Sequence, residues 1–261
     1  SAVPFHMWTP DVYEGAPTPV TALFAVAPKI AAISLLVSVL MGPFKPLFDQ
    51  WQQIIVVASV LSMALGAFAA LRQQNIKRLM AYSSIGNVGY VLLGLASGSE
   101  KGIEAVVFYL AIYLVMTLGV FATILMMKRR DIMLENISDL AGLARSQPMM
   151  AFAMLIFMFS LAGIPPLAGF WGKLYIFIAA VEAKLYIPAV LGVLASVVSS
   201  YYYLRVVKVM YFDEPAEALD RPIFGVNRAV ALVAAFLVAV FSLLPQPLSL
   251  IAAAAAKGLF P

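Results

Sequence analysis

Apolar residues come in long runs along this chain, and most runs have the length of a membrane-spanning helix. About 20 apolar residues cross a bilayer as a helix, whereas the alternation of a transmembrane barrel strand is not seen. We therefore predict an all-α polytopic membrane protein with about seven crossings. Six are expected as continuous spans, at about residues 19–41, 51–71, 76–96, 103–127, 186–211 and 226–251.

The other crossing, over about residues 148–181, is predicted to be a broken helix. It contains Gly163, Pro165, Pro166, Gly169 and Gly172. Proline removes backbone donors and glycine weakens a helix, so the segment is expected to be interrupted near the middle of the bilayer. At about 1.5 Å per residue it is too long for one straight span and too short for two. Backbone groups freed at that depth need protein or cavity water as partners.

The first 18 residues are expected to form a loop and the end of a preceding helix, and residues 19–261 the helical bundle. Asp11 and Glu14 in this loop could collect protons at the entrance of a proton path. They could equally be ordinary acidic residues of an interfacial loop. The opening SAVPFHMW has neither an initiator methionine nor a basic leader region. It therefore indicates a fragment of a longer chain.

Composition agrees with a membrane protein and narrows its chemistry. Hydrophobic residues make up 63% of the chain and charged residues 11%, and the mean hydropathy is +0.96. The chain has no cysteine and one histidine, His6. It therefore cannot form a disulfide, ligate an iron–sulfur cluster through cysteine or build a histidine metal site. We expect no metal or cofactor on this chain, and the small net charge of +4 gives no support to nucleic-acid binding.

Basic residues are unevenly distributed between the two sets of predicted loops. Segments 1–18, 72–78, 128–147 and 205–228 hold eleven of the 17 Lys and Arg residues, and the opposite loops hold four. By the positive-inside rule the first set is cytoplasmic, or faces the matrix if the membrane is mitochondrial. The two basic residues left inside the membrane are Lys29 and Lys173. These two lysines are the strongest functional signal in the sequence.

A lysine at mid-bilayer costs a few kcal/mol and needs a carboxylate partner or water. Lysine can also gain and lose a proton, as a proton relay requires, which arginine cannot. The alternative is a structurally paired or snorkelling lysine, but both residues lie too centrally to snorkel. We therefore interpret Lys29 and Lys173 as parts of a hydrated proton path.

Other polar residues allow two interpretations each. His6 suits proton transfer or packing near Trp8, and Lys77 suits the proton path or a topology anchor. Ser84 and Tyr109 belong to a set of polar side chains that could line a water path or bond helices together. The remaining members of that set are Ser83, Asn87, Tyr90, Tyr113 and Thr117. Tyr201, Tyr202 and Tyr203 are expected in an interfacial aromatic belt.

Three stretches, in order, carry a resemblance to a known family: HMWTPDVYEGAPTPVTALFAVAPK, QQNIKRLMAYSSIGNVGY and SLAGIPPLAGFWGKLYIF. They resemble the proton-translocating antiporter-like subunits of respiratory complex I. The likeness is closest to the N-subunit family of bacterial NADH-quinone oxidoreductase, whose mitochondrial equivalent is subunit 2. It covers essentially the whole chain, and lysine in both membrane segments fits this family better than the L and M subunits or the Mrp antiporters.

The resemblance implies the second inverted repeat of a fourteen-helix fold, with the broken helix as the twelfth. It implies that Lys29 links two half-channels and that Lys173 exchanges protons with the outer side. It also implies a glutamate on helix five and a lysine on helix seven, which these residues do not include, so a complete input half-channel is not expected here.

The resemblance further implies partners, cofactors and a location. NAD, FMN, iron–sulfur clusters and quinone would bind partner subunits, and neighbouring membrane subunits and lipid would surround the chain. The expected location is the bacterial inner membrane, with the mitochondrial inner membrane as the alternative. A cation/proton antiporter of the Mrp type and a purely structural membrane module remain the alternative functions.

Overall fold

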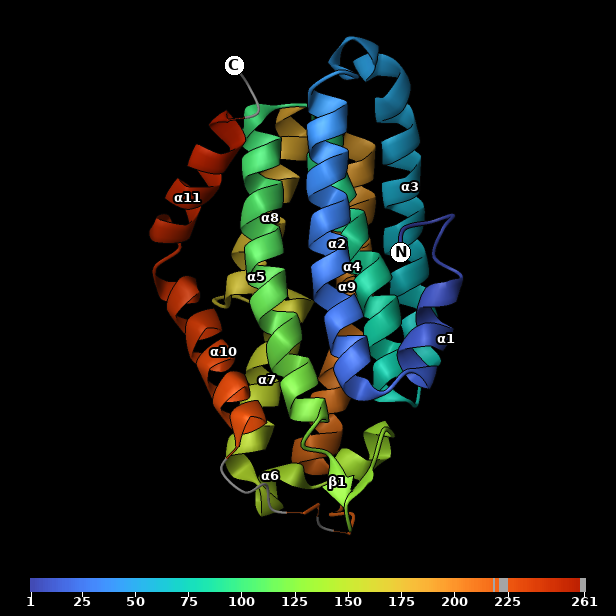
Figure 1. Ribbon diagram of the computed structural model, residues 1–261, viewed down its shortest axis with the longest axis vertical. Coiled ribbons are helices and arrows are strands. Elements are labelled where there is room, and N and C mark those ends of the chain that lie inside the picture. The colour runs from blue at the N-terminus through green and yellow to red at the C-terminus, as the bar shows by residue number, and fades with distance from the viewer. Residues whose placement is uncertain (218, 221–224, 259–261) are drawn as a thin grey trace.

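The computed structural model describes residues 1–217, 219–220 and 225–258, and most of these residues lie in long helices that run side by side (Figure 1). Six helical stretches in this part of the chain are long and apolar enough to cross a membrane. Five are single α-helices and the sixth is α3 with its short flanking turns. The helices are α2 (Thr18–Met41), α3 (Phe48–Ala69), α4 (Ile76–Ala96), α5 (Glu100–Ile124), α9 (Tyr186–Phe212) and α10 (Val226–Leu243). The predicted all-α membrane fold is confirmed.

Short elements connect the long helices and lie mostly at one end of the bundle. A two-residue antiparallel ladder pairs Lys128 with Met133 and Arg129 with Ile132. The short elements are η1 (Lys45–Leu47), η2 (Ala70–Arg72), β1 (Lys128–Arg129), β2 (Ile132–Met133), η3 (Ile137–Leu140) and α6 (Leu143–Ser146).

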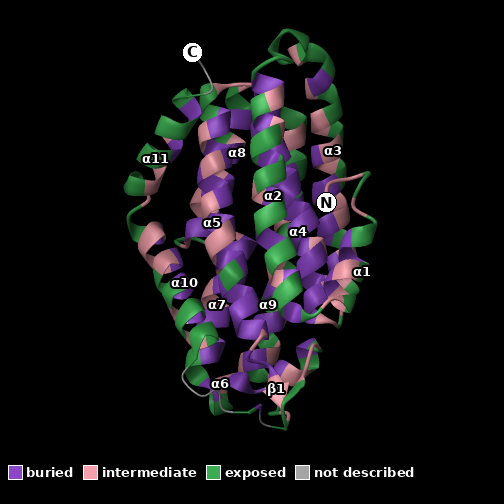
Figure 2. Ribbon diagram, in the orientation of Figure 1, coloured by how far each residue is buried: buried purple, intermediate pink, exposed green. Residues whose placement is uncertain are grey.

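Helix α4 is the centre of the bundle. Its membrane span is 94% buried, whereas the spans of α2, α3, α9 and α10 are 28–33% buried (Figure 2). Helix α3 lies very close to α4 at Gly66 and Gly86. A Cβ added to Gly66 would lie only 2.5 Å from the main-chain nitrogen of Gly86. Small residues allow such close helix contact in membranes. The polar side chains of α4 are therefore held in the interior and kept away from lipid.

The predicted broken helix is present as α7 (Pro148–Ala162) and α8 (Ala168–Glu182). Gly163 ends α7 with φ of +83°, in the left-handed region that glycine adopts without steric cost. Pro165 and Pro166 follow and cannot continue the helix. With the six long spans, this broken element completes the predicted set of seven crossings.

The prediction of a loop over residues 1–18 is wrong for part of that segment. Residues Trp8–Gly15 form a helix, α1. Pro10 is its third residue, and proline is tolerated in the first turn, where its missing N–H has no intrahelical acceptor. The prolines that suggested a loop therefore fit the start of this short helix.

The prediction of one continuous span over residues 226–251 is also wrong. Helix α10 ends at Leu243, and α11 (Gln246–Lys257) begins after a break at Leu244 and Pro245. Leu244 has φ of −130° and ψ of 74°, outside the helical region. A residue before proline is disfavoured in the helical conformation, which accounts for the break. In Figure 1, α11 continues in the same general direction as α10 but at a different angle.

The basic loops gather at one end of the bundle, as the charge distribution predicts. An isolated bridge joins Asn75 to Asn136, and the main-chain N–H of Asp220 donates to the carbonyl of Lys128 at 2.8 Å. At the other end Lys101 forms an ion pair with Glu182 at 2.8 Å. The lower end of Figure 1 holds β1 and α6, and the upper end holds the α2–α3 turn.

Candidate functional site

Lys29 of α2 is buried in the bundle, with 8% of its surface exposed. Its ammonium donates to the hydroxyls of Tyr13 and Ser84 and lies 4.8 Å from the centre of the Tyr13 ring. Tyr113 of α5 donates to the same Ser84 oxygen at 2.9 Å. These partners are neutral, and none of the ion pairs among the described residues includes Lys29. Proton exchange at this amine therefore does not require the separation of a buried ion pair, which costs about 3–5 kcal/mol.

Helix α1 places Tyr13 against Lys29. Tyr13 is fully buried. Arg78, in the first turn of α4, donates to Asp11 at 2.7 Å and to Glu14 at 2.8 Å, so it ties the charged face of α1 to α4. Arg78 is thus a structural partner of Asp11 and Glu14. It holds α1 against α4, and the buried face of α1 carries Tyr13.

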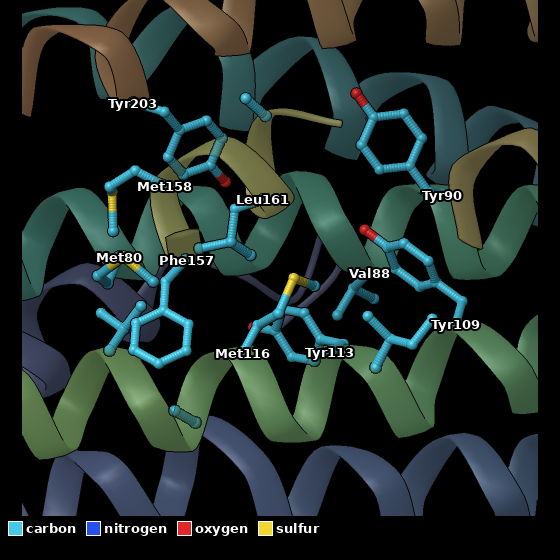
Figure 3. Close-up of a cluster of buried hydrophobic side chains, with 14 of the residues drawn as sticks. Met80, Val88, Tyr90, Tyr109, Tyr113, Met116, Phe157, Met158, Leu161 and Tyr203 are labelled. Carbon is cyan, nitrogen blue, oxygen red and sulfur yellow. The ribbon is translucent and has the colours of Figure 1, made fainter. Parts of the chain in front are cut away.

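A second hydrogen-bonded group follows one face of α4. Tyr109 donates to Asn87 Oδ1 at 2.7 Å, and Asn87 Nδ2 donates to Ser83 Oγ at 3.3 Å. Ser83 shares a 2.5 Å hydrogen bond with the hydroxyl of Tyr203 on α9. Figure 3 shows Tyr109 and Tyr203 among the side chains that converge from α4, α5, α7 and α9. The group links three helices through side-chain oxygens and nitrogens that can donate and accept.

The stacked rings of Tyr109 and Tyr113 bring the two groups together. Their centroids are 6.4 Å apart with an interplanar angle of 17°. Tyr113 bonds to the Ser84 that contacts Lys29, whereas Tyr109 packs on Gly172, where an added Cβ would lie 2.6 Å from the ring. Gly172 precedes Lys173 in α8. These two hydrogen-bonded groups, with the stacked rings between them, form what we call the polar row. It extends from Lys29 to Gly172, the residue next to Lys173.

Lys173 is buried beside the break between α7 and α8, with 5% of its surface exposed. Its ammonium donates to the main-chain carbonyls of Leu161 at 2.9 Å and Ala162 at 3.2 Å, and to Ser196 Oγ at 3.0 Å. It also lies 4.9 Å from the centre of the Tyr90 ring, a favourable place for a cation. As with Lys29, no ion pair among the described residues includes this amine.

The partners of Lys173 follow from the way that α7 ends. The last four carbonyls of a helix have no intrahelical donor. The N–H groups of Gly163 and Ile164 donate to Phe159, and Gly163 also donates to Ser160, which leaves the carbonyls of the last two residues of the helix. Lys173 donates to both of these carbonyls. Its charge also faces the negative end of the α7 dipole, so the lysine acts as the cap of this half-helix.

Four of the six predicted site residues, Lys29, Ser84, Tyr109 and Lys173, lie along this row. The other two lie outside it. Lys77 is buried at the start of α4, where it forms a 2.5 Å ion pair with Glu135 and donates to the carbonyl of Ala16 at 2.9 Å. His6 is half-buried ahead of α1, and its Nδ1 has no hydrogen-bond partner in the described part of the chain. A role for either residue in proton transfer remains a prediction.

Sequence reasoning missed Tyr13, Ser196 and Tyr203. The expectation that Tyr201–Tyr203 form an interfacial belt is wrong for Tyr202 and Tyr203, which are 2% and 1% exposed. Only Tyr201, at 61%, faces outward. The available signal was spacing, because Ser196 and Tyr203 are seven residues apart and so share one helix face. No comparable signal marks Tyr13, whose contact depends on how α1 folds back.

Together the fold and the site define an antiporter-like polytopic membrane protein, with two buried lysines, a polar row between them and a broken helix beside one of the lysines. The chain belongs to the NADH:quinone oxidoreductase/Mrp antiporter transmembrane family, whose model matches residues 1–199. Its multiple spans and its bacterial relatives make it a multi-pass protein of the bacterial inner membrane.

Curated relatives of high identity are N subunits of NADH-quinone oxidoreductase. The subunit from Paramagnetospirillum magneticum is 60% identical over 261 residues, which cover 100% of this chain and 54% of the relative. The subunit from Rhodospirillum rubrum is 58% identical over 259 residues, covering 99% of this chain and 53% of the relative. The chain thus spans about half the length of the curated relatives it matches.

Solved structures share the fold. A chain of respiratory complex I from Thermus thermophilus, with bound aureothin, matches with a TM-score of 0.82 and 38% identity, over 95% of this chain and 54% of that one. A chain of the Mrp complex from Dietzia sp. matches with a TM-score of 0.88 and 24% identity, over 99% of this chain and 56% of that one. The second likeness concerns the fold alone.

Proposed function

We propose that this chain is part of a proton-translocating membrane subunit of NADH-quinone oxidoreductase. Protons would pass from the basic end of the bundle to Lys29, along the polar row of α4 and α5 to Lys173, and then outward. The observation that carries the proposal is the environment of the two buried amines. Both are held by neutral oxygens, and the polar row lies between them, with ring contacts where no hydrogen bond joins its parts.

The row favours proton transfer over passive packing for a physical reason. Each hydroxyl on it can donate and accept a hydrogen bond, and the amide of Asn87 supplies both functions on separate atoms. The hydroxyls can therefore hand on a proton as their hydrogen bonds reverse, with water completing the gaps between them. The Asn87 amide orients its neighbours, because it accepts from Tyr109 and donates to Ser83. A positive charge arriving on one lysine would also disfavour the charge on the other, which would couple the two sites.

Redox chemistry would occur on partner subunits. NADH oxidation with FMN, electron transfer through iron–sulfur clusters and quinone reduction need cofactors that this cysteine-free chain does not ligate through cysteine. The proposed partners are the neighbouring membrane subunits of the same complex and the surrounding lipid. In that assembly the chain would be a translocating part of an enzyme and would have no redox centre of its own.

Cation/proton antiport of the Mrp type is the second candidate, because the family whose model matches the chain also includes Mrp antiporters. A Na⁺ or K⁺ ion needs several oxygen ligands, which can be carboxylates or main-chain carbonyls. The oxygens within hydrogen-bonding distance of Lys29 and Lys173 in the described residues are hydroxyls and main-chain carbonyls. These oxygens already accept from a lysine ammonium, whose positive charge would repel a second cation at the same place. The occupied sites therefore favour protons as the transported species.

The test is to replace Lys29 and Lys173 separately with methionine in the assembled complex. NADH-driven proton uptake and quinone reduction would be measured in the same vesicles. Lys101→Met is the control, because Lys101 is exposed at the end of the bundle opposite to the basic loops. We expect less proton uptake per electron for both buried variants and normal coupling for the control. Unchanged coupling would contradict the proposal, and gradient-driven Na⁺ exchange lost without any change in redox coupling would favour the antiporter.

A further inference from the structure

A cavity of about 330 Å³ opens at the basic end of the bundle, away from the two buried lysines. It lies where α5 ends and where α7 and α10 begin. Both helix starts contribute to its wall. The residues that matter for its chemistry are Ser146, Gln147, Met150, Ala153, Arg228 and Leu232.

One edge of the cavity is polar and positively charged. Arg228 lines it from the first turn of α10, and Ser146 and Gln147 line it just ahead of α7. Arg145, next to Ser146, is exposed at the same end. None of the described lining residues carries a carboxylate. The local charge therefore suits an anion.

The two helix starts add to this preference. In the described residues neither α7 nor α10 has a side-chain cap at its N-terminus, whereas α4 is capped by Asn75 and α5 by Ser99. The first N–H groups of a helix have no intrahelical acceptor, and the dipole makes that end positive. A phosphate at this edge would meet the side chain of Arg228 and the positive ends of two helix dipoles.

The rest of the cavity is apolar. Met150 and Ala153 of α7 face Ala231 and Leu232 of α10 across it. Met149 at its rim is 52% exposed, which leaves an open side. Both helices run from here into the membrane span. A free phosphate ion would use only the polar edge, whereas the methionine, alanine and leucine side chains suit a hydrocarbon chain.

We propose that this cavity binds an anionic phospholipid of the membrane leaflet at the basic end. Its phosphate lies at Arg228 and the starts of α7 and α10, and an acyl chain enters between Met150 and Leu232. Basic pockets between membrane helices on the cytoplasmic side are suited to such head groups. The site is separate from the proton row and does not depend on it.

The test uses the full-length protein, purified with its partner subunits and stripped of lipid in detergent. Binding of dioleoylphosphatidylglycerol is measured by native mass spectrometry and compared with dioleoylphosphatidylcholine. Inorganic phosphate is then added as a competitor. Arg228→Gln is expected to weaken phosphatidylglycerol binding about tenfold, the size of one charge-assisted hydrogen bond. Leu232→Trp fills the apolar part and is expected to weaken it while leaving the charge in place.

Arg72→Gln is the matched control, because Arg72 is exposed at the same end and does not line the cavity. Its binding should equal that of the parent protein. If Arg228→Gln prevents assembly, the Leu232→Trp result decides. Equal binding of phosphatidylcholine, complete displacement by millimolar phosphate, or parental binding in the cavity-filling variant would each overturn the proposal.

Discussion

The ammonium of Lys173 donates to the main-chain carbonyl of Leu161 at 2.9 Å, across the break between α8 and α7. The lysine thus reaches back to the end of the preceding half-helix and supplies the donor that the interrupted backbone lacks. Its charge and the geometry of the break are linked by this contact. Loss of a proton from Lys173 would remove one of its three donors and the charge that faces the α7 dipole.

Replacing Lys173 with methionine should therefore affect stability as well as proton transfer. The carbonyl of Leu161 loses its donor, whereas that of Ala162 keeps the longer bond from Ser196 at 3.4 Å. An unsatisfied buried acceptor costs about 1–3 kcal/mol. We expect a lower thermal midpoint for Lys173→Met, while Lys101→Met at the surface shows little change. Differential scanning calorimetry of the purified complex checks this. An unchanged midpoint would show that water replaces the lysine at no cost.

Replacing Ser84 is expected to slow proton transfer more than replacing another buried serine. It accepts from both Lys29 and Tyr113, so Ser84→Ala removes the atom that joins them. Loss of one hydrogen bond to a charged group is worth about 1.5–3 kcal/mol, which corresponds to a fall of roughly ten- to hundredfold in proton transfer rate if the loss falls on the barrier. Ser59→Ala is the matched control, because Ser59 only donates to the carbonyl of Gly89. Proton uptake in vesicles should fall in the first variant and persist in the second.

The ion pair of Lys77 with Glu135 offers a way to decide whether Lys77 belongs to the proton path or is a structural anchor. The Lys77 side chain is 2% exposed and that of Glu135 is 28% exposed, so Lys77→Met should destabilise the protein by about 1–3 kcal/mol. If the pair is structural, the double variant Lys77→Met/Glu135→Met recovers stability and translocates protons normally. Restored stability with poor proton uptake would instead place Lys77 on the proton path.

The hydrogen bonds of Asp220 at the basic end of the bundle should weaken in acid. The pKa of the Asp220 carboxyl lies below its usual value, because the main-chain N–H groups of Asp131 and Arg130 donate to it. A lowered folded-state pKa means that the contribution is present above the unfolded value and is lost as pH falls through the folded one. Hydrogen exchange at these two amides, corrected for intrinsic rates, should accelerate in that acidic range. In Asp220→Asn the acid dependence should disappear, and its persistence would contradict this account.

Much of the fold could be predicted because the bilayer leaves few choices. Runs of apolar residues gave the long spans, and the glycines and prolines near Lys173 gave the broken helix. Local patterns failed at prolines, because proline fits the first turn of a helix and also interrupts a helix that precedes it. Pro10 lies in the first turn of a helix, whereas Pro245 follows the residue at which α10 is broken.

The site was predictable in its charges and less so in its connections. Lys29 and Lys173 stand out because basic residues are rare at membrane depth. The contact between Tyr13 and Lys29 could not be predicted, since it depends on Arg78 holding α1 against α4. The carbonyls that bind Lys173 belong to the backbone and leave no signature in side-chain identity.

The central claim is that Lys29 and Lys173 are joined by a continuous hydrated route. A density map of the assembled protein, at a resolution that shows ordered water, tests this most directly. The account predicts water molecules that bridge the Ser84–Tyr113 group to the Asn87–Tyr109 group and reach both amines. Two amines in dry pockets, with no water between these groups, would contradict it.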